Sequence, residues 1–503
     1  MFKFRKIIAK YNENTLVFFL LLFATAVRLR NLSAPIYGSY TWRNTQTAWG
    51  IRSVANGVIS PFAVELPVLG PPWIIPFEFP LFQLIAGVLA RFTGLSVEVS
   101  GRLTSITFFI STAVVFYLIS KYFFNQFISL LLLLIFLFNA HNLEYGSAVL
   151  IEYCAMFFSL SAFLFGLKYL SLFKPNYLIL FYIFASIGAL VKITTSVIWT
   201  LLGSIVLLFI QRSKLRDSLY LLGAGLLSII PSLAWNYWAD EQKSKSNFTY
   251  WLTSKNLRTW NFGTIRQRLN IFEWEKSVQQ IFLPSVVGSS IVAFLLVVLA
   301  ILFSKYPRRP VAFLALFSSG PIVFTNLYFV HDYYWTAVIP AFLIVLGFGL
   351  NALSNPEVVI AKSVALRIRL FQVIGVMGLV TASCLTPAGI IHFRVFIKEG
   401  LIESSTAVDT IKIHTQSSDR IIIIGEDWNP EILYYSNRKG LMVPSSFDPE
   451  SFIDKDELGT IYKYIFWTMD ELIQIKDAQK VVGDIPLVRI TRNFFRIEPN
   501  LTN

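Results

Sequence analysis

The stretch Tyr40-Thr-Trp-Arg-Asn-Thr-Gln-Thr-Ala-Trp49 lies in a polar, proline-rich loop of roughly seventy residues that runs from Arg28 to Ser100. The same loop carries Glu78-Phe-Pro-Leu81. It separates the first two of about eleven apolar segments, each long enough or nearly long enough to cross a bilayer. Short connectors suffice to join membrane spans, so a loop of this size is predicted to hold a functional site against the membrane surface.

The composition identifies an integral membrane protein. Of the 503 residues, 55% are hydrophobic and 15% are charged, and the mean hydropathy of +0.60 is too high for a soluble chain. The net charge of +13 is spread between apolar segments rather than gathered in one stripe, which argues against a nucleic-acid-binding protein. The two cysteines, Cys154 and Cys384, fall in apolar stretches, so no disulfide framework is predicted.

Hydropathy predicts eleven membrane-spanning segments, which place the two termini on opposite sides of the membrane. Their windows are 14–33, 101–120, 123–140, 147–167, 177–191, 194–210, 218–236, 284–304, 310–329, 335–351 and 370–391. The first window is interpreted as an uncleaved span rather than a signal peptide, because no small-residue cleavage site follows it.

Charge sets the predicted orientation. With the N-terminus inside, the cytoplasmic stretches hold sixteen basic residues, from Lys3 to Arg369, and only three acidic ones. This bias favours a multi-pass protein of the plasma (inner) membrane with a cytoplasmic N-terminus. The loop 28–100 and the C-terminal tail then lie on the extracytoplasmic side.

The predicted fold is an all-α polytopic membrane protein with a small C-terminal α/β extracytoplasmic domain. Residues 1–392 form the transmembrane part, including the outer loop 28–100 and a second outer segment, 237–283. From 393 to 503 the composition becomes that of a soluble domain. Within it, Arg420–Gly425, 462–468 and 487–490 are predicted strands, and 430–437 is a predicted helix.

The first loop holds two groups of candidate residues. Apolar residues recur at helical spacing from Ala48 to Val58, which predicts an amphipathic helix lying on the membrane, with Trp42, Arg43 and Gln46 elsewhere around its turns. An interfacial anchor would show the same residues. Glu78 follows several prolines and precedes an apolar stretch, so stiffened backbone presents its carboxylate at a helix entrance, where a purely helix-starting role is the alternative.

Two ionisable residues lie inside or beside apolar segments, where they are expensive and usually paired or functional. Glu152 falls within the fourth segment, and the alternative to catalysis is a carboxylate held against Arg102 or Lys192. Lys192 follows a window of only fifteen residues, about 22 Å of helix against a roughly 30 Å hydrocarbon core. It is therefore predicted to lie below the outer surface in a polar cavity.

The stretch His331-Asp-Tyr-Tyr334 ends a predicted span on the outer side, where imidazole and phenol groups can bind a phosphate or a hydroxyl. A belt of interfacial aromatics is the alternative. The other histidines show no metal-ligand spacing with His331, so no zinc site is predicted, while a divalent cation held by acidic residues stays open.

Taken in order, these motifs resemble the polytopic glycosyltransferases of the GT-C fold that use polyprenyl-phosphate sugars, especially bacterial aminoarabinose transferases and protein O-mannosyltransferases (the family 39-like group). Trp42–Ala48 is similar to the family's first-loop motif and Glu78–Leu81 to its second. The other matching stretches, spread over the whole chain, are Tyr145-Gly146 with Glu152, Ala189–Lys192, His331–Tyr334 and Tyr434–Gly440.

The resemblance implies an inverting transfer of a sugar from a polyprenyl-phosphate donor to a lipid, glycan or protein acceptor on the outer face, as in lipopolysaccharide or protein glycosylation. Family members commonly carry an acid in the first-loop motif as catalytic base, whereas Tyr40–Ile51 contains no Asp or Glu and has Gln46 near that place. Glu78 is therefore the favoured base, with Glu152 or Asp332 behind it. The residues predicted to bind the donor's phosphate or sugar are Arg43, Gln46, Trp42, Lys192, His331, Tyr333, Tyr334 and Tyr145.

Two rival functions stay open. A transporter or flippase of lipid-linked sugars would place polar groups near the bilayer midplane, whereas the polar groups of this chain gather toward the outer face. A noncatalytic relative that binds such lipids would account for the missing first-loop acid.

Overall fold

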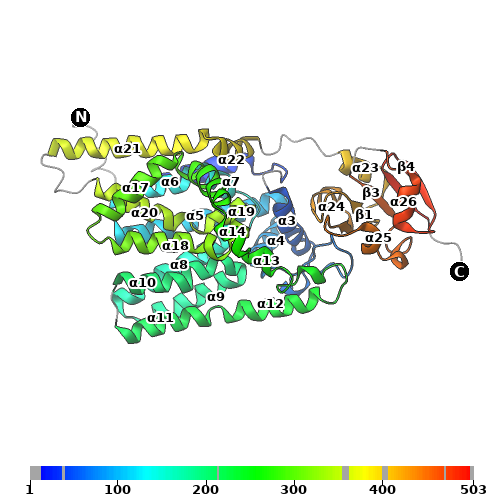
Figure 1. Cartoon of the computed structure of the whole chain (residues 1–503), viewed down its shortest axis with the longest axis horizontal. Helices are drawn as coiled ribbons and strands as arrows, with labels where there is room; N and C mark the ends of the chain where they lie inside the picture. The colour runs from blue at the N-terminus through cyan, green and yellow to red at the C-terminus, as the bar shows by residue number, and fades with distance from the viewer. Residues whose placement is uncertain are drawn as a thin grey trace. The chain divides into compact units, whose positions relative to one another are not determined.

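The computed structural model describes residues 13–36, 40–211, 214–353, 362–398, 406–468 and 472–498 (Figure 1). Several basic residues of the orientation argument, including Lys3, Lys10 and Arg212, lie outside these ranges. The chain divides into two compact units. The first comprises Met1–Ser39, Glu98–Asn236 and Lys255–Gly400, and the second comprises Tyr40–Val97, Tyr237–Ser254 and Leu401–Asn503.

The first unit is built from helices. Its longer helices are α2 (Glu13–Arg28), α5 (Val97–Phe123), α6 (Gln126–Phe138), α8 (Glu152–Leu172), α9 (Pro175–Val197), α10 (Gly203–Gln211), α11 (Leu215–Leu227), the first half of α12 (Ile230–Lys243), α17 (Ser290–Phe303), α18 (Arg308–Val323), α20 (Ile339–Ala352), α21 (Lys362–Leu385) and α22 (Pro387–Lys398). The second half of α12, from Tyr237, belongs to the second unit. Shorter elements are η1 (Leu29–Asn31), α7 (Ala140–Tyr145), η3 (Ile198–Leu202), α13 (Arg258–Phe262), α14 (Ile265–Leu269), α15 (Ile271–Trp274), η5 (Glu275–Phe282), α16 (Leu283–Val287), α19 (Thr325–Val330) and η6 (Asp332–Ala337).

Several of these helices are long and apolar enough to cross a membrane, so the chain is a multi-pass membrane protein. The described residues contain six such helices, or seven if the bent pair Ile271–Val287 and Ser290–Phe303 is one span. Three further apolar helices, Leu81–Thr93, α6 and α20, are shorter. The predicted number of eleven spans is therefore not confirmed, because several windows correspond to short or broken helices.

The windows 177–191 and 194–210 fall in one helical stretch, Pro175–Gln211, which is broken at Lys192. Lys192 has extended backbone angles (φ −161°, ψ 97°) where the two helical halves meet. Beyond it, the Ser196 hydroxyl donates to the Ala185 carbonyl at 3.3 Å, whereas a straight helix would separate residues eleven apart by about 16 Å. The stretch is thus a helical hairpin with Lys192 at its tip.

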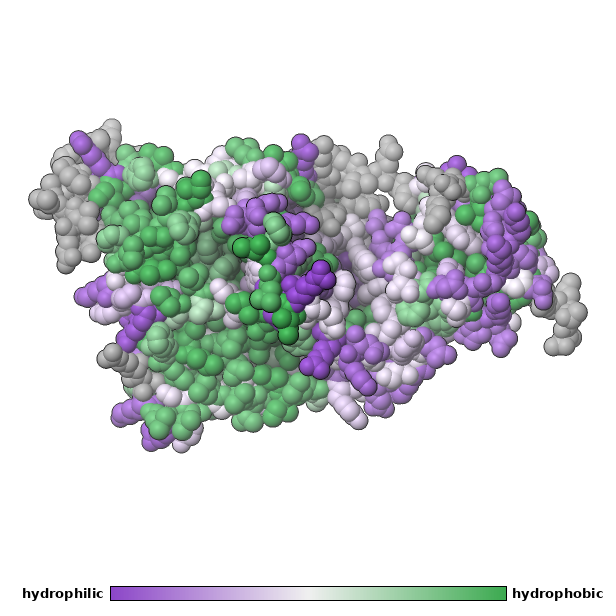
Figure 2. Space-filling model, in the orientation of Figure 1, coloured by the Kyte–Doolittle hydropathy of each residue, from purple (hydrophilic) through white to green (hydrophobic). Residues whose placement is uncertain are grey.

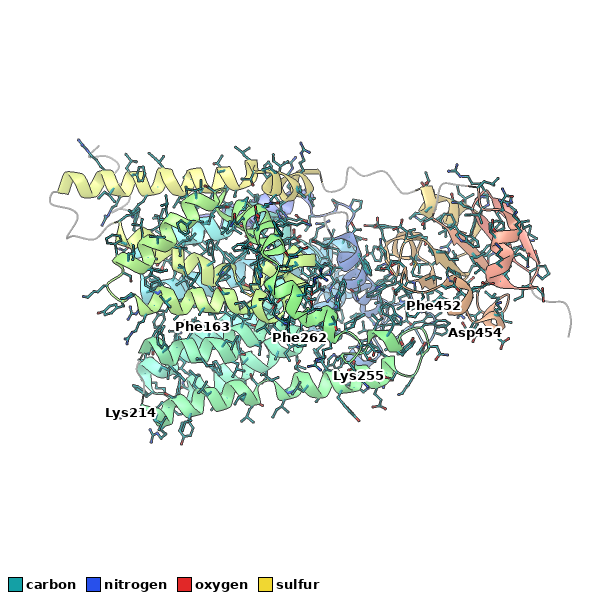
Figure 3. The ribbon with its side chains drawn as sticks, viewed as in Figure 1. Phe163, Lys214, Lys255, Phe262, Phe452 and Asp454 are labelled. Atoms are coloured by element: carbon teal, nitrogen blue, oxygen red, sulfur yellow. The ribbon has the colours of Figure 1, made fainter. Side chains whose placement is uncertain are left out.

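The hairpin packs against α8 through aromatic rings and small residues. Phe184 of the first arm lies 5.2 Å from Phe165, and Phe163, which is labelled in Figure 3, lies 5.2 Å from Trp199, which follows the tip. Both arms therefore contact the same helix. Figure 1 likewise shows α17, α18 and α20 side by side, and Figure 2 shows hydrophobic residues over the outer surface of the first unit's helices. That surface suits contact with lipid.

The second unit combines the first loop with the C-terminal sheet. Its elements are α3 (Thr41–Ala55), η2 (Pro61–Ala63), α4 (Leu81–Thr93), η4 (Tyr250–Leu252), α23 (Thr406–His414), β1 (Arg420–Ile424), α24 (Glu431–Ser436), β2 (Lys439–Val443), α25 (Pro449–Phe452), η7 (Lys455–Glu457), β3 (Tyr464–Trp467), α26 (Ile475–Val482), β4 (Leu487–Thr491) and β5 (Phe494–Ile497). In Figure 3, Phe452 and Asp454 mark this C-terminal part.

The sheet has five strands in the order β2-β1-β3-β5-β4. β1 pairs in parallel with β2 and β3, and β5 pairs antiparallel with β3 and β4. The predicted strands at Arg420–Gly425, 462–468 and 487–490 correspond to β1, β3 and β4, and the predicted helix corresponds to α24. Sequence reasoning missed β2 and β5, because Lys439-Gly440 and Arg496 interrupt their apolar pattern.

The first loop adds a short extended segment to the free edge of β2. Gly440 N donates to the Pro67 carbonyl at 3.1 Å, Met442 N to the Val68 carbonyl at 2.7 Å, and Gly70 N to the Gly440 carbonyl at 3.2 Å. These bonds satisfy an edge that would otherwise be unpaired. They also explain why the compact units do not coincide with the predicted division between 392 and 393: the loop shares its hydrogen bonds with the C-terminal sheet.

The helix α3 exists as predicted, but it does not lie on a surface. Residues Asn44 to Ile51 are all buried, polar ones included. Gly87 of α4 lets the two helices approach so closely that an added Cβ would overlap Val54. The predicted exposed face of this helix is wrong, because α3 is covered by α4 and α24 within the second unit; its place relative to the membrane stays a prediction.

We predict that Gly440→Ala destabilises the second unit by roughly 1–3 kcal/mol, because the new Cβ would overlap the Ile421 carbonyl oxygen and contact Leu433. Thermal unfolding and limited proteolysis of the purified protein measure this effect. Gly378→Ala in α21 is the matched control, since nothing lies within 4 Å of its added Cβ. Unfolding of Gly440→Ala at the wild-type temperature would contradict the prediction.

Candidate functional site

In the second unit, α3 presents Arg43 and Gln46 to the carboxylate of Glu78. The Arg43 guanidinium donates to Gln46 Oε1 at 2.6 Å and to Glu78 Oε1 at 2.5 Å. The side chains of Arg43 and Glu78 are 19% and 29% exposed, so the ion pair is accessible. Glu78 lies two residues before Pro80, the N-cap of α4, and hence outside the helix. Three predicted residues that are up to 35 positions apart thus form one group.

Trp42 points into a cluster of aromatic rings. Its ring lies 4.8 Å from Trp428, which follows β1, and the two planes are nearly perpendicular. Phe77 stacks on Trp428 at 5.8 Å, and Trp251 lies 5.9 Å away. Trp42 and Phe77 directly precede Arg43 and Glu78 in sequence, so the ring cluster adjoins the ion pair.

In the first unit, Lys192 and Glu152 form a buried ion pair. Lys192 Nζ donates to Glu152 Oε1 at 2.6 Å, and each side chain is only 3% exposed. The ammonium also lies 3.8 Å from the ring centre of Tyr334 and 5.0 Å from that of Tyr333. Glu152 Oε2 is buried and has no hydrogen-bond partner among the described residues. The break in the helix at Lys192 directs its side chain to the start of α8.

The His331–Tyr334 motif forms a stack of rings beside this pair. His331 lies 5.2 Å from Tyr333 and nearly parallel to it, and Tyr333 lies 5.0 Å from Tyr334. The three rings come from His331, the N-cap of η6, and from the second and third residues of η6. The stack combines a cation, aromatic faces and phenol groups, which suits an anionic or sugar-bearing ligand.

Asp332 belongs to a second polar network in the same unit. The Tyr145 hydroxyl donates to Asp332 Oδ1 at 2.5 Å. His392 of α22 lies between two carboxylates: its Nδ1 is 2.6 Å from Glu144 Oε2, and its Nε2 is 3.6 Å from Asp332 Oδ2. His392 is 2% exposed. Burial lowers the pKa of His392, but the hydrogen bond to Glu144 and the charges of both carboxylates outweigh it and raise the pKa above its ordinary value.

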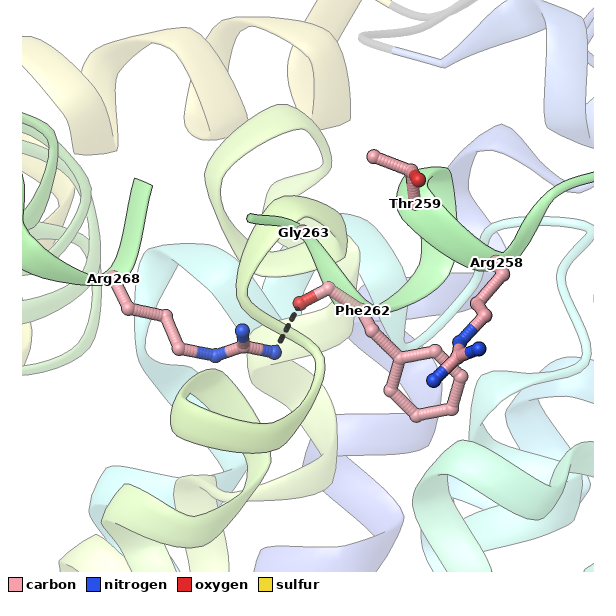
Figure 4. A pocket seen from close by; sticks show the side chains of 5 residues that line it. All are labelled: Arg258, Thr259, Phe262, Gly263 and Arg268. Carbon is pink, nitrogen blue, oxygen red and sulfur yellow. Dashed lines mark hydrogen bonds between the residues drawn. The ribbon is translucent and has the colours of Figure 1, made fainter. Parts of the chain in front are cut away.

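A cavity of about 530 Å³ opens at α13 and α14 (Figure 4). It is lined by Arg258, Thr259, Phe262, Gly263 and Arg268. Arg268 is fixed by bonds to the carbonyls of Phe262 and Ile322 at 2.6 and 3.1 Å. Arg258 is exposed and makes no side-chain hydrogen bond or ion pair within the described part of the chain. The cavity thus offers one fixed and one unengaged guanidinium.

The cavity adjoins the histidine motif. Trp260, in the same short helix as Arg258, lies 6.0 Å from the His331 ring, and α13 packs against α19, which ends directly before His331. Among the described residues, no three His, Cys, Asp or Glu side chains are arranged to hold a metal ion.

Solved structures with the same arrangement of elements include ArnT from Cupriavidus metallidurans bound to undecaprenyl phosphate. It has a TM-score of 0.61 and 12% identity, over 96% of this chain and 97% of that one. The apo oligosaccharyltransferase of Archaeoglobus fulgidus matches with a TM-score of 0.52 and 10% identity, over 89% of this chain and 69% of that one.

A mycobacterial arabinofuranosyltransferase, AftD, matches with a TM-score of 0.52 and 12% identity, over 90% of this chain and 35% of that one. All three neighbours are GT-C glycosyltransferases. The chain has the GT-C fold. No protein-family model matches the sequence, and no curated protein matches it in sequence.

Within this GT-C fold, the predicted site residues form two groups. Arg43, Gln46, Glu78 and Trp42 lie together in the second unit, whereas Tyr145, Glu152, Lys192, His331, Asp332, Tyr333 and Tyr334 lie in the first. Sequence reasoning did not select His392, Arg258 or Trp428. A signal for His392 existed, because it is one of only four histidines and directly follows the last predicted span.

We predict that His392→Gln lowers the free energy of unfolding by about 3 kcal/mol near neutral pH, because it removes the imidazolium that lies between the carboxylates of Glu144 and Asp332. A raised folded-state pKa means that protonated His392 stabilises the protein fully below its ordinary pKa of 6.5, and that this stability is lost as pH rises through the folded-state pKa. The deficit of the variant should therefore be larger at pH 6 than at pH 9.

Thermal unfolding at both pH values measures this difference. His414→Gln is the control, because His414 is exposed at the end of α23. An equal deficit at both pH values would show that His392 acts by packing and carries no charge.

Proposed function

We propose that this chain is a membrane glycosyltransferase that moves one sugar from a polyprenyl-phosphate donor to a hydroxyl or amine of a lipid, glycan or protein acceptor. The observation that carries the proposal is the match over 96% of the chain to a GT-C protein solved with undecaprenyl phosphate. The cationic and aromatic groups of both units support it, since such a donor presents a phosphate and a sugar.

The proposed reaction needs one proton acceptor. As the acceptor oxygen or nitrogen attacks the anomeric carbon, a carboxylate takes its proton and the bond to the donor's phosphate breaks, with inversion at that carbon. The phosphate leaves as a stable anion, so a second carboxylic acid is unnecessary, unlike in glycosidases. We assign the base to Glu78, whose partly exposed carboxylate is oriented by Arg43.

The donor's phosphate requires cations that are not already neutralised. In the first unit, Lys192 shares its charge with Glu152, whereas the Arg258 guanidinium faces the cavity without a partner among the described residues. We assign Arg258 to the phosphate, and Lys192 with Tyr333 and Tyr334 to the polar part of the donor. A guanidinium can form two parallel hydrogen bonds with phosphate oxygens, which strengthens the contact.

The direct test supplies purified protein in lipid with a panel of radiolabelled polyprenyl-phosphate sugars and candidate acceptors from the host envelope. Formation of a labelled acceptor from one donor would establish the activity and identify the sugar. Donor binding without turnover, with every acceptor supplied, would instead favour a noncatalytic relative. Movement of the labelled lipid across the bilayer without transfer would favour the flippase.

We predict that Glu78→Gln lowers transfer by at least about 100-fold while donor binding stays within about twofold, because the amide can still accept from Arg43 but cannot take a proton. Single-turnover rates and donor binding measure the two effects. Glu65→Gln is the matched control, since Glu65 lies in the same loop, is similarly exposed and pairs with Lys439 at 2.7 Å. Near-normal turnover of Glu78→Gln would transfer the role of base to Asp332 or Glu152.

We predict that Arg258→Gln weakens binding of undecaprenyl phosphate about tenfold, which corresponds to about 1.4 kcal/mol. Arg266→Gln is the control, because Arg266 is an exposed arginine of α14 that does not line the cavity. Titration of each variant in detergent micelles measures the dissociation constants. Equal losses in both variants would mean that the arginines act only through the overall charge of the surface.

A further inference from the structure

The carboxyl ends of three parallel strands lie at one edge of the C-terminal sheet. β1 ends at Ile424 and leads into Gly425-Glu-Asp-Trp-Asn429, and β2 ends at Val443 and leads into Pro444–Asp448. The two loops are joined, because Ser445 N donates to Asp427 Oδ1 at 2.9 Å. In open α/β sheets, ligands bind outside the carboxyl ends of parallel strands. The loop with Trp428 therefore occupies the edge where a ligand is expected.

Rings from three distant parts of the sequence converge on this edge within the second unit. Trp42 and Phe77 come from the first loop, Trp251 from the segment 237–254, and Trp428 from the sheet. Phe447 of the loop after β2 lies 5.7 Å from Trp251 and extends the cluster. All five rings are half-buried rather than enclosed, unlike the rings of the sheet's own core, such as Phe494 and Phe495.

Charged groups flank these rings. Arg43 and Glu78 directly follow Trp42 and Phe77, and Lys243 Nζ lies 5.6 Å from the centre of the Phe77 ring. Glu426, two residues before Trp428, is exposed. A sugar ring presents an apolar C–H face beside hydroxyls that both donate and accept. Aromatic faces bordered by carboxylates and cations complement that chemistry.

We propose that the carboxyl edge of the C-terminal sheet, centred on Trp428, binds a carbohydrate ring of the acceptor. The inference rests on the proposed glycosyltransferase function, and it gives the C-terminal sheet a direct part in substrate binding. The acceptor is favoured over the donor because Glu78, the assigned base, adjoins Phe77, and a base must reach the attacking hydroxyl. This proposal restricts the candidate acceptors from any lipid, glycan or protein to molecules with a sugar at or next to the attacking group.

The test uses the intact protein in detergent and methyl glycosides of glucose, mannose, galactose and N-acetylglucosamine as probes. Saturation-transfer NMR detects weak binding through the ring protons of the sugar. We expect one glycoside to give a signal that Trp428→Ala reduces about fivefold or more. The control is Trp238→Ala, which should leave the signal unchanged. Trp238 lies in the same 237–254 segment as Trp251, but its ring packs on Phe62 of the first loop instead of on Trp428.

Two further measurements separate the outcomes. Trp428→Phe keeps an aromatic face, so this variant should retain the glycoside signal. Equal unfolding temperatures of the two Trp428 variants and the wild type would show that Trp428→Ala does not lose the signal by misfolding. Binding of undecaprenyl phosphate is titrated in parallel, because it tests the donor side of the proposed function independently of the sugar site. A variant that loses the glycoside and keeps the lipid would support the proposal.

Three results would overturn it. A glycoside signal that persists in Trp428→Ala would place the sugar elsewhere, and no signal with any glycoside in the wild type would remove the carbohydrate site. Displacement of the bound glycoside by the polyprenyl-phosphate sugar, but not by sugar-free polyprenyl phosphate, would assign the ring cluster to the donor's sugar instead of the acceptor's.

Discussion

The buried ammonium of Lys192 holds three elements of the first unit together. Removing an amine charge from water costs several kcal/mol unless a close opposite charge and further polar contacts replace the lost hydration. Glu152 supplies the charge at 2.6 Å, and the face of Tyr334 supplies a second contact at 3.8 Å. Three separate elements, the α9 hairpin tip, the start of α8 and η6, must therefore meet at one point. The broken helix at Lys192 is the local consequence.

The same rule explains the other buried charges of this unit. Arg28, at the end of the first span, is 1% exposed and donates to the carbonyls of Leu137 and Asn142 at 2.8 and 2.7 Å. Its guanidinium also lies 3.9 Å from the Phe109 ring. His392 likewise lies between two carboxylates, those of Glu144 and Asp332. Each buried ion thus links helices that are distant in sequence. These contacts also fix the positions of the polar side chains of the candidate site.

Sequence patterns predicted the individual helices and strands better than the contacts between them. Hydropathy found the helical segments, and the position of Lys192 between two short apolar windows indicated a break that the structure contains. The alternation of apolar residues likewise found β1, β3 and β4. The number of spans was not recoverable, because a window average cannot distinguish a straight helix from a bent pair such as α16 and α17, where the axes differ by 86°.

The candidate site shows the same division. The sequence could predict three site residues of the first loop, Arg43, Gln46 and Glu78, because they lie close together in the chain. It could also predict the motif His331–Tyr334, because its four residues are consecutive. His392 pairs with a carboxylate 248 positions away, and Trp428 contacts rings from two other segments. Such contacts arise only when the helices and the sheet have packed. No local sequence spacing predicts such contacts, so only the structure identified these residues as part of the candidate site.

The missing acid of the first loop has a physical counterpart in the charge of Arg43. An acid at position 46 would add a second negative charge beside Arg43 and Glu78, whereas Gln46 offers a neutral oxygen at 2.6 Å from the guanidinium that also donates to Glu78. The amide keeps the geometry of Arg43, because it accepts the same hydrogen bond that a carboxylate would. With one positive and one negative charge, the pair is neutral and tolerates partial burial. Gln46 therefore keeps Arg43 in place and leaves the proposed role of base to Glu78.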